Sequence, residues 1–379
     1  MVASFHAKGM GAGGILVRSA DSSAADRTRM QMFGHLEELG LHRQVKCIEN
    51  ACTHTMRLQL DEDSYLAWTP YCDTTGLCET LHLDTTNPPD LEREIFIAML
   101  AGPIPFTFPS FEELLCAVHI RRNIVDAARR TALAFATSQA ERPADYWTYM
   151  QGRGFTLLPG KSLIAALRKA TQPEESGSLY SFSCYRATEY VILLAIAQEI
   201  ECCNPELLER LQRHWESRAI MSGEFHDVFL REHGSMEAPL PLRYFVPGDR
   251  TWFRNPDDHS SDASGYEGSW VMYLGGGLFS NFWKRAEPYT LTGKCLEMYH
   301  WRHATYRDDE GELRIDESIV EERVRASRSD AGEVERILAK MLRHREPSGV
   351  YVDGGCIDTT REYARWVCPG TSDMVLPAH

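Results

Sequence analysis

The chain has 379 residues and a formal net charge of −14, and 43% of its residues are hydrophobic. This balance is typical of a globular protein, and the negative charge argues against electrostatic binding to nucleic acid or to a membrane surface. No apolar run is long enough to span a membrane, and the first residues show no signal-peptide core.

The N-terminal part is predicted to form two regions. Residues 1–25 are rich in glycine, alanine and serine, which favours a mobile N-terminus. Residues 26–105 are expected to form an accessory layer, in which short strand-like runs lie between Leu58 and Leu83 with a turn at Asp61 to Asp63. A helix follows from Asp90, and the proline-rich stretch after it predicts a stiff connector at a domain boundary.

Residues 106–305 are predicted to form the core of the protein. Ser110 and Glu113 have the spacing of a capping box, and an amphipathic helix is expected to follow to about residue 138. Further helices are expected from Leu163 and from Pro205.

The second half of this core changes from helices to strands. From Arg243 short apolar and aromatic runs, including Tyr244 to Val246, are joined by turn-rich loops. Helices followed by strands indicate an α+β fold rather than a doubly wound α/β sheet. Residues 306–379 are predicted to be a helical C-terminal extension, with a charged helix or helix pair over 316–345.

Cys184 carries the clearest chemical signal. It follows a short alternating run that begins at Leu179 and precedes the longest apolar stretch of the chain, Tyr190 to Ile200. This order predicts a strand-to-helix junction with the thiol on the first turn of a buried helix, where the helix dipole lowers a thiol pKa. The resulting thiolate would be a nucleophile for acyl transfer, and the alternative is an inert buried cysteine. A thiol on a helix facing an antiparallel sheet is also the papain-like arrangement.

The stretch from about Phe106 to Trp301 resembles the small bacterial transglutaminases that crosslink spore-coat proteins. Four segments carry the resemblance by their shared order and spacing. They are Arg122 to Ala128 with Phe135-Ala136-Thr137 and Tyr146-Trp147 after it, Tyr180 to Cys184, Gly248-Asp249 with Trp252 to Pro256 and Val271 to Gly275, and Leu291 to Lys294.

The resemblance implies a transglutaminase-like core and a protein-glutamine gamma-glutamyltransferase without a cofactor. Such enzymes join a glutamine side chain to an amine through a cysteine thioester, so Cys184 would be the nucleophile. Two glutamates of the family are absent: Ser183 stands directly before the cysteine, and Ser269 stands in the triplet before the strand. Asn281 lies in the stretch that replaces the family's His-Gly pair, and Glu267 is the nearest substitute acid, carried by a glycine-flanked loop.

Two histidines are further candidates for acid–base chemistry. His214 matches a histidine of the family, although its place on an amphipathic helix is also typical of a structural residue. His259 lies in a polar loop before Glu267, where a solvated histidine is the alternative. The candidates for substrate binding are Tyr180, Ser183, Trp252, Asn255 and Trp270, although tryptophans in such strands are more often core residues.

The eleven cysteines are an odd number scattered along the chain, which predicts a reduced, cytoplasmic protein. Delivery by a secretion system would leave no recognisable mark in this sequence. The spacings Cys47-x4-Cys52 and Cys72-x5-Cys78, near His54 and His82, differ from those of zinc knuckles, so no metal site is expected.

Two other functions remain open. The missing glutamates are compatible with an amide synthase that uses a carrier-bound thioester in natural-product assembly, because a thiolate leaves easily. They are also compatible with a non-catalytic binding protein on the same scaffold. The expected partners are a protein, peptidyl-carrier or acyl-carrier acyl donor and an amine acceptor, with neither nucleic acid nor membrane.

Overall fold

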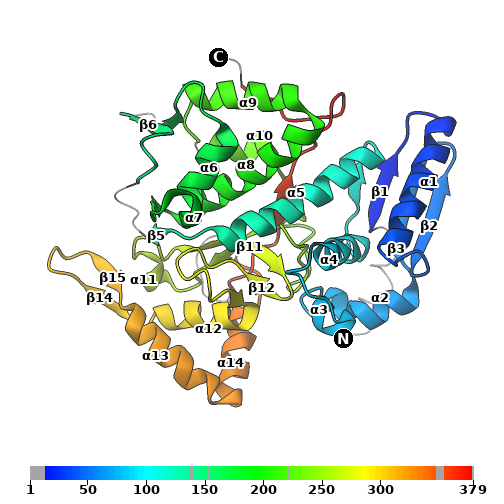
Figure 1. Cartoon of the computed structure of the whole chain (residues 1–379). Coiled ribbons are helices and arrows are strands. Elements are labelled where there is room, and N and C mark those ends of the chain that lie inside the picture. The colour runs from blue at the N-terminus through cyan, green and yellow to red at the C-terminus, as the bar shows by residue number, and fades with distance from the viewer. Residues whose placement is uncertain (1–12, 136–139, 152–153, 221, 347–353, 378–379) are drawn as a thin grey trace.

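The computed structural model describes residues 13–377 except 136–139, 152–153, 221 and 347–353, and Figure 1 labels its elements. Residues 1–12 of the predicted mobile N-terminus, and Ala136 and Thr137 of the compared segments, lie outside the described residues. None of the described helices is both long enough and apolar enough to cross a membrane.

An antiparallel sheet of six strands forms the centre of the molecule, in the order β13-β12-β11-β10-β16-β9. Its longest strand is buried on both faces, because Met272 and Leu274 belong to the main apolar cluster whereas Val271 and Tyr273 belong to a second one. The six strands are β9 (Leu230–His233), β10 (Arg250–Arg254), β11 (Gly268–Gly275), β12 (Leu278–Phe279), β13 (Tyr289–Thr290) and β16 (Arg361–Ala364).

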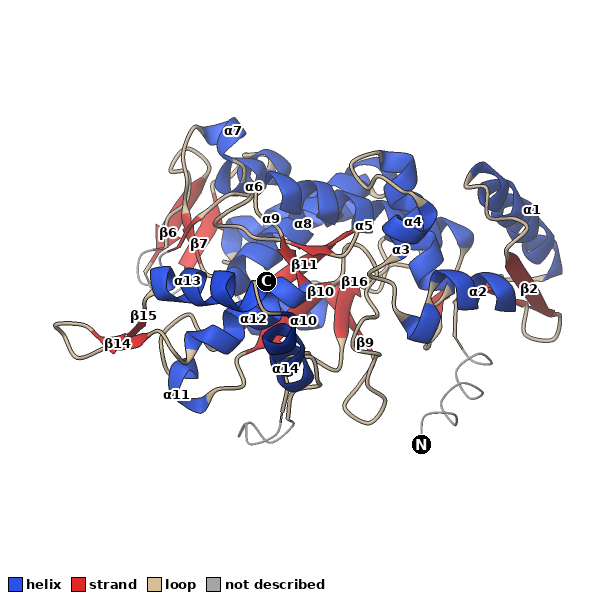
Figure 2. Ribbon diagram, turned by 90° about the horizontal axis from the view of Figure 1, so that it is seen from below, coloured by secondary structure: helices blue, strands red, loops and turns tan. Residues whose placement is uncertain are grey.

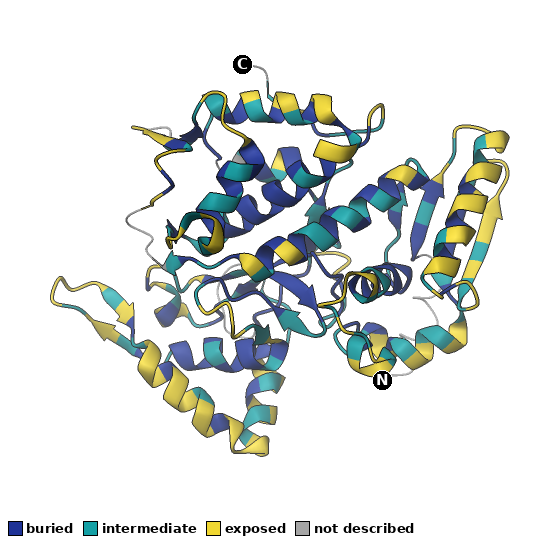
Figure 3. Ribbon diagram, in the orientation of Figure 1, coloured by how far each residue is buried: buried dark blue, intermediate teal, exposed yellow. Residues whose placement is uncertain are grey.

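Two long helices, α5 (Phe111–Arg130) and α8 (Cys184–Cys203), pack along each other, and both contact β11. Helix α5 begins at the predicted cap, because the Ser110 hydroxyl accepts the N–H of Glu113 at 3.2 Å, but it ends well before residue 138. Helix α8 is apolar around most of its circumference, so it is buried without a break over 187–197 (Figure 3). This burial fixes its first residue, Cys184, against the sheet.

Shorter elements cover these two helices. Helices α6 and α9 begin at the predicted positions, each with a side-chain cap, from Ser162 and Asn204 respectively. The covering elements are β5 (Ala134–Phe135), β6 (Trp147–Met150), β7 (Gly154–Leu157), α6 (Leu163–Thr171), α7 (Pro173–Ser176), β8 (Ser181–Phe182), α9 (Pro205–Ser217) and α10 (Ser222–Phe229).

The N-terminal layer is a separate sheet of four strands, in the order β2-β3-β1-β4, and lies at one end of the molecule (Figure 2). Its first strand begins at Ile15, inside the segment that was expected to be mobile. Its last strand pairs in parallel with the first, so the layer extends past residue 105. Its elements are β1 (Ile15–Arg18), α1 (Ser22–Glu38), β2 (Val45–Asn50), β3 (Thr55–Leu60), α2 (Glu62–Trp68), η1 (Pro70–Cys72), α3 (Leu77–Leu81), α4 (Pro88–Leu100) and β4 (Phe106–Phe108).

Much of the stretch that was expected to be extended is helical. The carboxylate of Asp61 accepts the N–H of Ser64 at 2.8 Å and therefore starts helix α2, where the sequence analysis expected a turn between strands. Residues 244–246 likewise form no strand, because the side chain of Asp249 accepts the N–H of Val246 at 2.7 Å and folds this segment into a turn.

The C-terminal part combines a helix pair with a strand of the central sheet. Helices α13 and α14 match the pair that was predicted over 316–345, but the extension also supplies β16, which lies between β10 and β9. Thus the extension is not purely helical. Its elements and those leading to it are α11 (Asp258–Ser261), α12 (Leu291–Trp301), β14 (Thr305–Arg307), β15 (Leu313–Ile315), α13 (Glu317–Arg328) and α14 (Ala331–Met341).

The architecture confirms the predicted α+β fold. Long helices lie on an antiparallel sheet, and the cysteine of interest is the first residue of the most buried helix and faces that sheet. This is the papain-like arrangement expected above.

Candidate active site

Cys184 lies where strand β8 passes into helix α8. The hydroxyl of Ser183 caps the helix by accepting the N–H of Arg186 at 3.3 Å, so Cys184 occupies the first turn of the helix. Backbone hydrogen bonds from Tyr185, on the same helix, and from Trp270, on β11, act on the sulfur. The thiol is therefore held between a helix N-terminus and a strand of the central sheet.

The sulfur lies in the wall of a cavity of about 800 Å³. Four aromatic side chains contribute to the wall, and helix α13 supplies charged ones. The cavity is lined by Cys184, Gly265, Tyr266, Gly268, Ser269, Asn281, Trp283, Lys284, Glu287, Pro288, Tyr289, Thr290, Gly293, Lys294, Glu297, Trp301, Glu317, Val320, Glu321, Val324, Arg325 and Arg328. Cys184 is thus accessible to a small group that enters this cavity.

Lys294 is a buried cation in the same wall. Its side chain is 3% exposed, its ammonium lies 3.1 Å from a carboxylate oxygen of Glu297, and it stands 4.0 Å from the ring centroid of Tyr289. Burial by itself lowers the pKa of Lys294, but its interactions with the Glu297 carboxylate and, to a smaller extent, with Tyr289 and Cys184 outweigh burial and raise that pKa. The ammonium is therefore charged at neutral pH.

Sequence reasoning missed this lysine. It placed Lys294 in a matching turn without giving it a role, whereas the structure puts it on the first turns of α12, with Thr290 as the N-cap. A signal was present, because Lys294 stands among the apolar residues Leu291, Cys295 and Leu296 in the first half of the helix, where a buried lysine is uncommon.

The resting state of Cys184 differs from the expectation of a thiolate. Burial raises the pKa of the Cys184 thiol, and the charge of Glu267 adds to this increase. The hydrogen bonds from Trp270 and Tyr185 and the charge of Lys294 favour the thiolate, but they offset only part of the loss of solvation. The prediction of a lowered pKa was wrong because it considered the helix N-terminus and not the burial of the thiol.

Glu267 lies beside the cavity on the loop that leads into β11. Its side chain is exposed, one of its carboxylate oxygens accepts the N–H of Gly265 at 3.3 Å, and its charge reaches the Cys184 thiol. Gly268 next to it has no room for a side chain, since a Cβ would stand 2.3 Å from the indole nitrogen of Trp252. Glu267 is not itself among the residues that line the cavity, but its neighbours Tyr266 and Gly268 are, and the tight packing at Gly268 fixes the backbone beside it.

The sequence model of the protein-glutamine gamma-glutamyltransferases matches residues 74–375. This chain belongs to the transglutaminase family. The match covers the core, the helix pair and β16, and it confirms the resemblance that rested on four short segments.

Individual transglutaminases are distant. The chain is 26% identical over 207 residues to the protein-glutamine gamma-glutamyltransferase of Halalkalibacterium halodurans, which covers 52% of this chain and 64% of that protein. It is 26% identical over 188 residues to the enzyme of Bacillus pumilus, which covers 48% of this chain and 70% of that protein. The solved transglutaminase of Geobacillus stearothermophilus without its C-terminal extension gives a TM-score of 0.39 at 19% identity, over 57% of this chain and 98% of that one.

Three residues that the sequence comparison matched to differing family positions lie in or next to the cavity wall. Ser269 and Asn281, which the resemblance matches to a family glutamate and to the His-Gly pair, both line the cavity. The amide of Asn281 donates to the backbone oxygen of Glu287 at 3.0 Å and so holds the cavity wall. Ser183 caps helix α8 as described above.

The two candidate histidines lie apart from the cavity wall that the structure describes. His214 is buried on α9 with its ring edge-on to Trp215 at 4.6 Å, and His259 is exposed in α11. Neither is among the residues that line the cavity beside Cys184. The cavity geometry therefore does not support either histidine as the acid–base partner of Cys184.

The candidate binding residues Trp252 and Trp270 stack on each other in the sheet, and neither is among the residues that line the cavity. The rings of Trp252 and Trp270 lie parallel at 5.7 Å, and Tyr185 meets Trp270 edge-on at 5.1 Å. Asn255 is buried, and its amide donates to the backbone oxygen of Tyr266 at 2.9 Å, so it fixes a loop of the cavity. Tyr180, which is partly buried, accepts the N–H of Ala134 at 3.0 Å through its backbone oxygen.

Proposed function

We propose that this transglutaminase-family protein is a cysteine-dependent acyltransferase that forms an amide or isopeptide bond through a thioester on Cys184. The supporting observation is the placement of Cys184 at the start of α8, in the wall of the 800 Å³ cavity that also holds the buried Lys294 ammonium. A thiol at a helix N-terminus beside a fixed cation can be ionised when substrate binds, although it rests protonated.

In the first half of the reaction, the Cys184 thiol gives its proton to a carboxylate, for which Glu267 is our candidate. The thiolate then attacks the carboxamide carbon of a glutamine side chain, and a C–S bond forms. The negative charge that develops on the carboxamide oxygen is stabilised by the Lys294 ammonium and backbone N–H groups. The C–N bond breaks, the nitrogen takes up a proton from the general acid, and ammonia leaves.

In the second half, an amine attacks the thioester carbon and loses a proton to the carboxylate. The C–S bond breaks, the thiolate is released, and the product is a secondary amide. The aromatic wall formed by Tyr266, Trp283, Tyr289 and Trp301 suits the methylene chains of glutamine and lysine side chains while their polar ends stay at the reacting centre. We therefore propose protein or peptide side chains as donor and acceptor.

A second candidate is an amide synthase that takes its acyl group from a carrier-bound thioester. The raised pKa of Cys184 and the presence of Ser269 in the place of an acid favour this alternative. A thioester donor releases a thiolate, which needs no proton on departure, so exchange between thioesters makes less demand on a general acid.

Intact-mass spectrometry of the full chain with each class of donor tests the proposal. Incubation with a glutamine-containing peptide and no amine is expected to give a covalent acyl adduct that maps to Cys184, with loss of ammonia. A labelled amine added afterwards should discharge it. The Cys184→Ala variant should form neither adduct nor product, whereas the matched Cys202→Ala variant, changed at an exposed cysteine of the same helix, should behave as the wild type.

The possible outcomes separate the three functions. An adduct from a carrier-bound thioester and none from glutamine peptides would support the amide synthase. Product formed by the Cys184→Ala variant would contradict the thioester mechanism. A non-catalytic binding protein would give no adduct with any donor, and alkylating agents would modify its Cys184 no faster than its other cysteines.

A further inference from the structure

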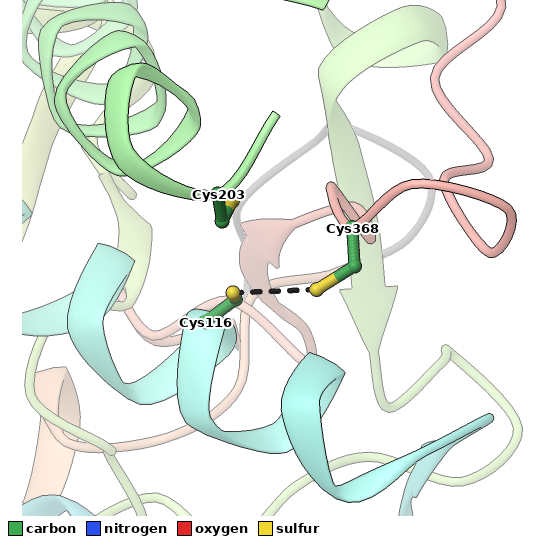
Figure 4. Close-up of side chains that lie close together, drawn as sticks. All are labelled: Cys116, Cys203 and Cys368. Atoms are coloured by element: carbon green, nitrogen blue, oxygen red, sulfur yellow. Dashed lines mark hydrogen bonds between the residues drawn. The ribbon is translucent and has the colours of Figure 1, made fainter. Parts of the chain in front are cut away.

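Three cysteines from distant parts of the sequence meet at the opposite end of α8 from the nucleophile. Cys116 comes from α5, Cys203 is the last residue of α8, and Cys368 lies just after β16; these three residues are the thiol cluster (Figure 4). The sulfurs of Cys116 and Cys368 are 3.3 Å apart, and the three sulfurs all lie within 4.8 Å of one another. Neither the reaction nor the cavity at Cys184 uses them.

The backbone around the thiol cluster is fixed by groups other than the sulfurs. The carboxylate of Glu113, one turn before Cys116 on α5, accepts the N–H of Val367 at 3.0 Å and of Cys368 at 2.8 Å. The amide of Asn204, next to Cys203, donates to the backbone oxygen of Val367 at 2.7 Å. Each of the two helices therefore holds the C-terminal segment beside its own cysteine, and the three sulfurs are brought together before any ligand binds.

The sulfur positions suit a soft divalent metal ion. Thiolate ligands lie about 2.3 Å from zinc in a tetrahedral site, which places ligand sulfurs roughly 3.8 Å apart. The sulfurs of Cys116 and Cys368 are 3.3 Å apart and that of Cys203 lies within 4.8 Å of both, so shifts of about 1 Å bring the thiol cluster to this spacing. Cys116 and Cys368 are 6% and 8% exposed, whereas Cys203 is only partly buried, so an ion and a solvent ligand can enter from its side.

We propose that Cys116, Cys203 and Cys368 bind one zinc-like metal ion, with a solvent molecule as the fourth ligand. Binding replaces three S–H protons, which are released to solvent, by three metal–sulfur bonds and changes no oxidation state. The ion would join α5, the end of α8 and the C-terminal segment that follows β16. Because it lies at the far end of the 20-residue helix α8 from Cys184, it would take no part in the reaction of the thiol.

Titration of the full chain with Co²⁺ or Cd²⁺ tests this site. The protein is reduced with a thiol-free phosphine under anaerobic conditions, in the Cys184→Ala background so that the nucleophile binds no metal. One equivalent of Co²⁺ should give sulfur-to-metal charge-transfer absorption and the visible bands of a tetrahedral ion, and Zn²⁺ should displace it. The melting temperature should rise with added Zn²⁺.

The neighbouring Cys202 provides a matched control. The Cys203→Ser variant should bind Co²⁺ at least tenfold more weakly, whereas Cys202→Ser, one residue earlier and exposed, should bind like the parent. The far-ultraviolet circular dichroism of both variants, which change a helix end, reports that they are folded. Equal Co²⁺ binding by the two variants, or no charge-transfer band in the parent, would overturn the proposal. So would a Cys116–Cys368 disulfide found by mass spectrometry in protein purified under reduction.

Discussion

Lys294 and Cys184 lie in the wall of the same cavity, and each changes the ionisation of the other. The ammonium lowers the pKa of the thiol, and the thiolate raises the pKa of the ammonium. Because Lys294 is almost fully buried among aromatic rings, its charge is poorly screened by water and acts on Cys184 more strongly than a surface charge would. Lys294 lies on α12, which is far along the chain from helix α8.

Replacing this lysine should make Cys184 less reactive. In the Lys294→Met variant the pH profile of Cys184 alkylation by iodoacetamide should move to higher pH, and the rate at pH 8 should fall by about fivefold to tenfold, because the cation that favours the thiolate is lost. Lys284→Met is the matched control, since Lys284 also lines the cavity but is half exposed and paired with Glu321. An unchanged alkylation profile in Lys294→Met would exclude the proposed charge relationship.

The proposed proton transfer by Glu267 can be tested by turnover and by the alkylation rate of Cys184, which should change in opposite directions. The Glu267→Gln variant should lose about 10²- to 10⁴-fold in turnover if this carboxylate transfers the proton. Its Cys184 should nevertheless be alkylated faster at neutral pH, because the negative charge that raises the thiol pKa is gone. Glu287→Gln, changed at an exposed carboxylate of the same cavity, serves as control. A variant with full turnover would show that another group carries the proton.

The elements that sequence reasoning predicted are those with a local signal. Helix α5 has a cap and an amphipathic period, and α8 has a continuous apolar run, so both were expected at nearly their observed starts. Strand β16 has only four residues and pairs with β9, which lies far earlier in the chain. No local sequence pattern therefore predicts this strand. The segment around α2 was misread because Tyr65 and Trp68 are typical of strands as well as of helices.

The candidate site shows the same division. Cys184 was found because its helix N-terminus is encoded by adjacent residues. Lys294 and the aromatic wall depend on how α12 and the loops after β12 fold back onto β11, which involves contacts between distant segments. The direction of the thiol pKa depends on burial, which no short sequence window contains. The thiol cluster was missed for the same reason, since its members are separated by most of the chain.

The acid stability of the protein should depend on His233. Its ring stacks on Phe106 at 4.1 Å, and burial together with the charges of Arg121 and Arg361 lowers its pKa from 6.5 to about 3. Below pH 6.5 the unfolded chain gains a proton at His233 that the folded protein does not bind. The free energy of unfolding therefore decreases as the pH is lowered, by about 3 kcal/mol at pH 4.

Urea unfolding between pH 7 and pH 4 measures this contribution. In His233→Phe the decrease in the free energy of unfolding over this range should be smaller by about 2–3 kcal/mol, while the same change at the exposed His42 should leave the wild-type slope. Equal slopes in His233→Phe and wild type would mean that His233 does not account for the loss.

The C-terminal segment should depend on one buried carboxylate. Glu113 is 1% exposed and accepts the N–H groups of Val367 and Cys368 and the hydroxyl of Thr371, the last at 2.6 Å. Glu113→Ala leaves the two buried N–H groups without an acceptor and should lower the free energy of unfolding by about 2–4 kcal/mol. The neighbouring Glu112 is exposed on the same helical turn, so Glu112→Ala should change it by less than about 0.5 kcal/mol. Limited proteolysis should cut the Glu113→Ala variant near its C-terminus sooner than the Glu112→Ala control. If the two variants were cleaved at the same rate and had the same urea midpoint, the segment would be held by other contacts.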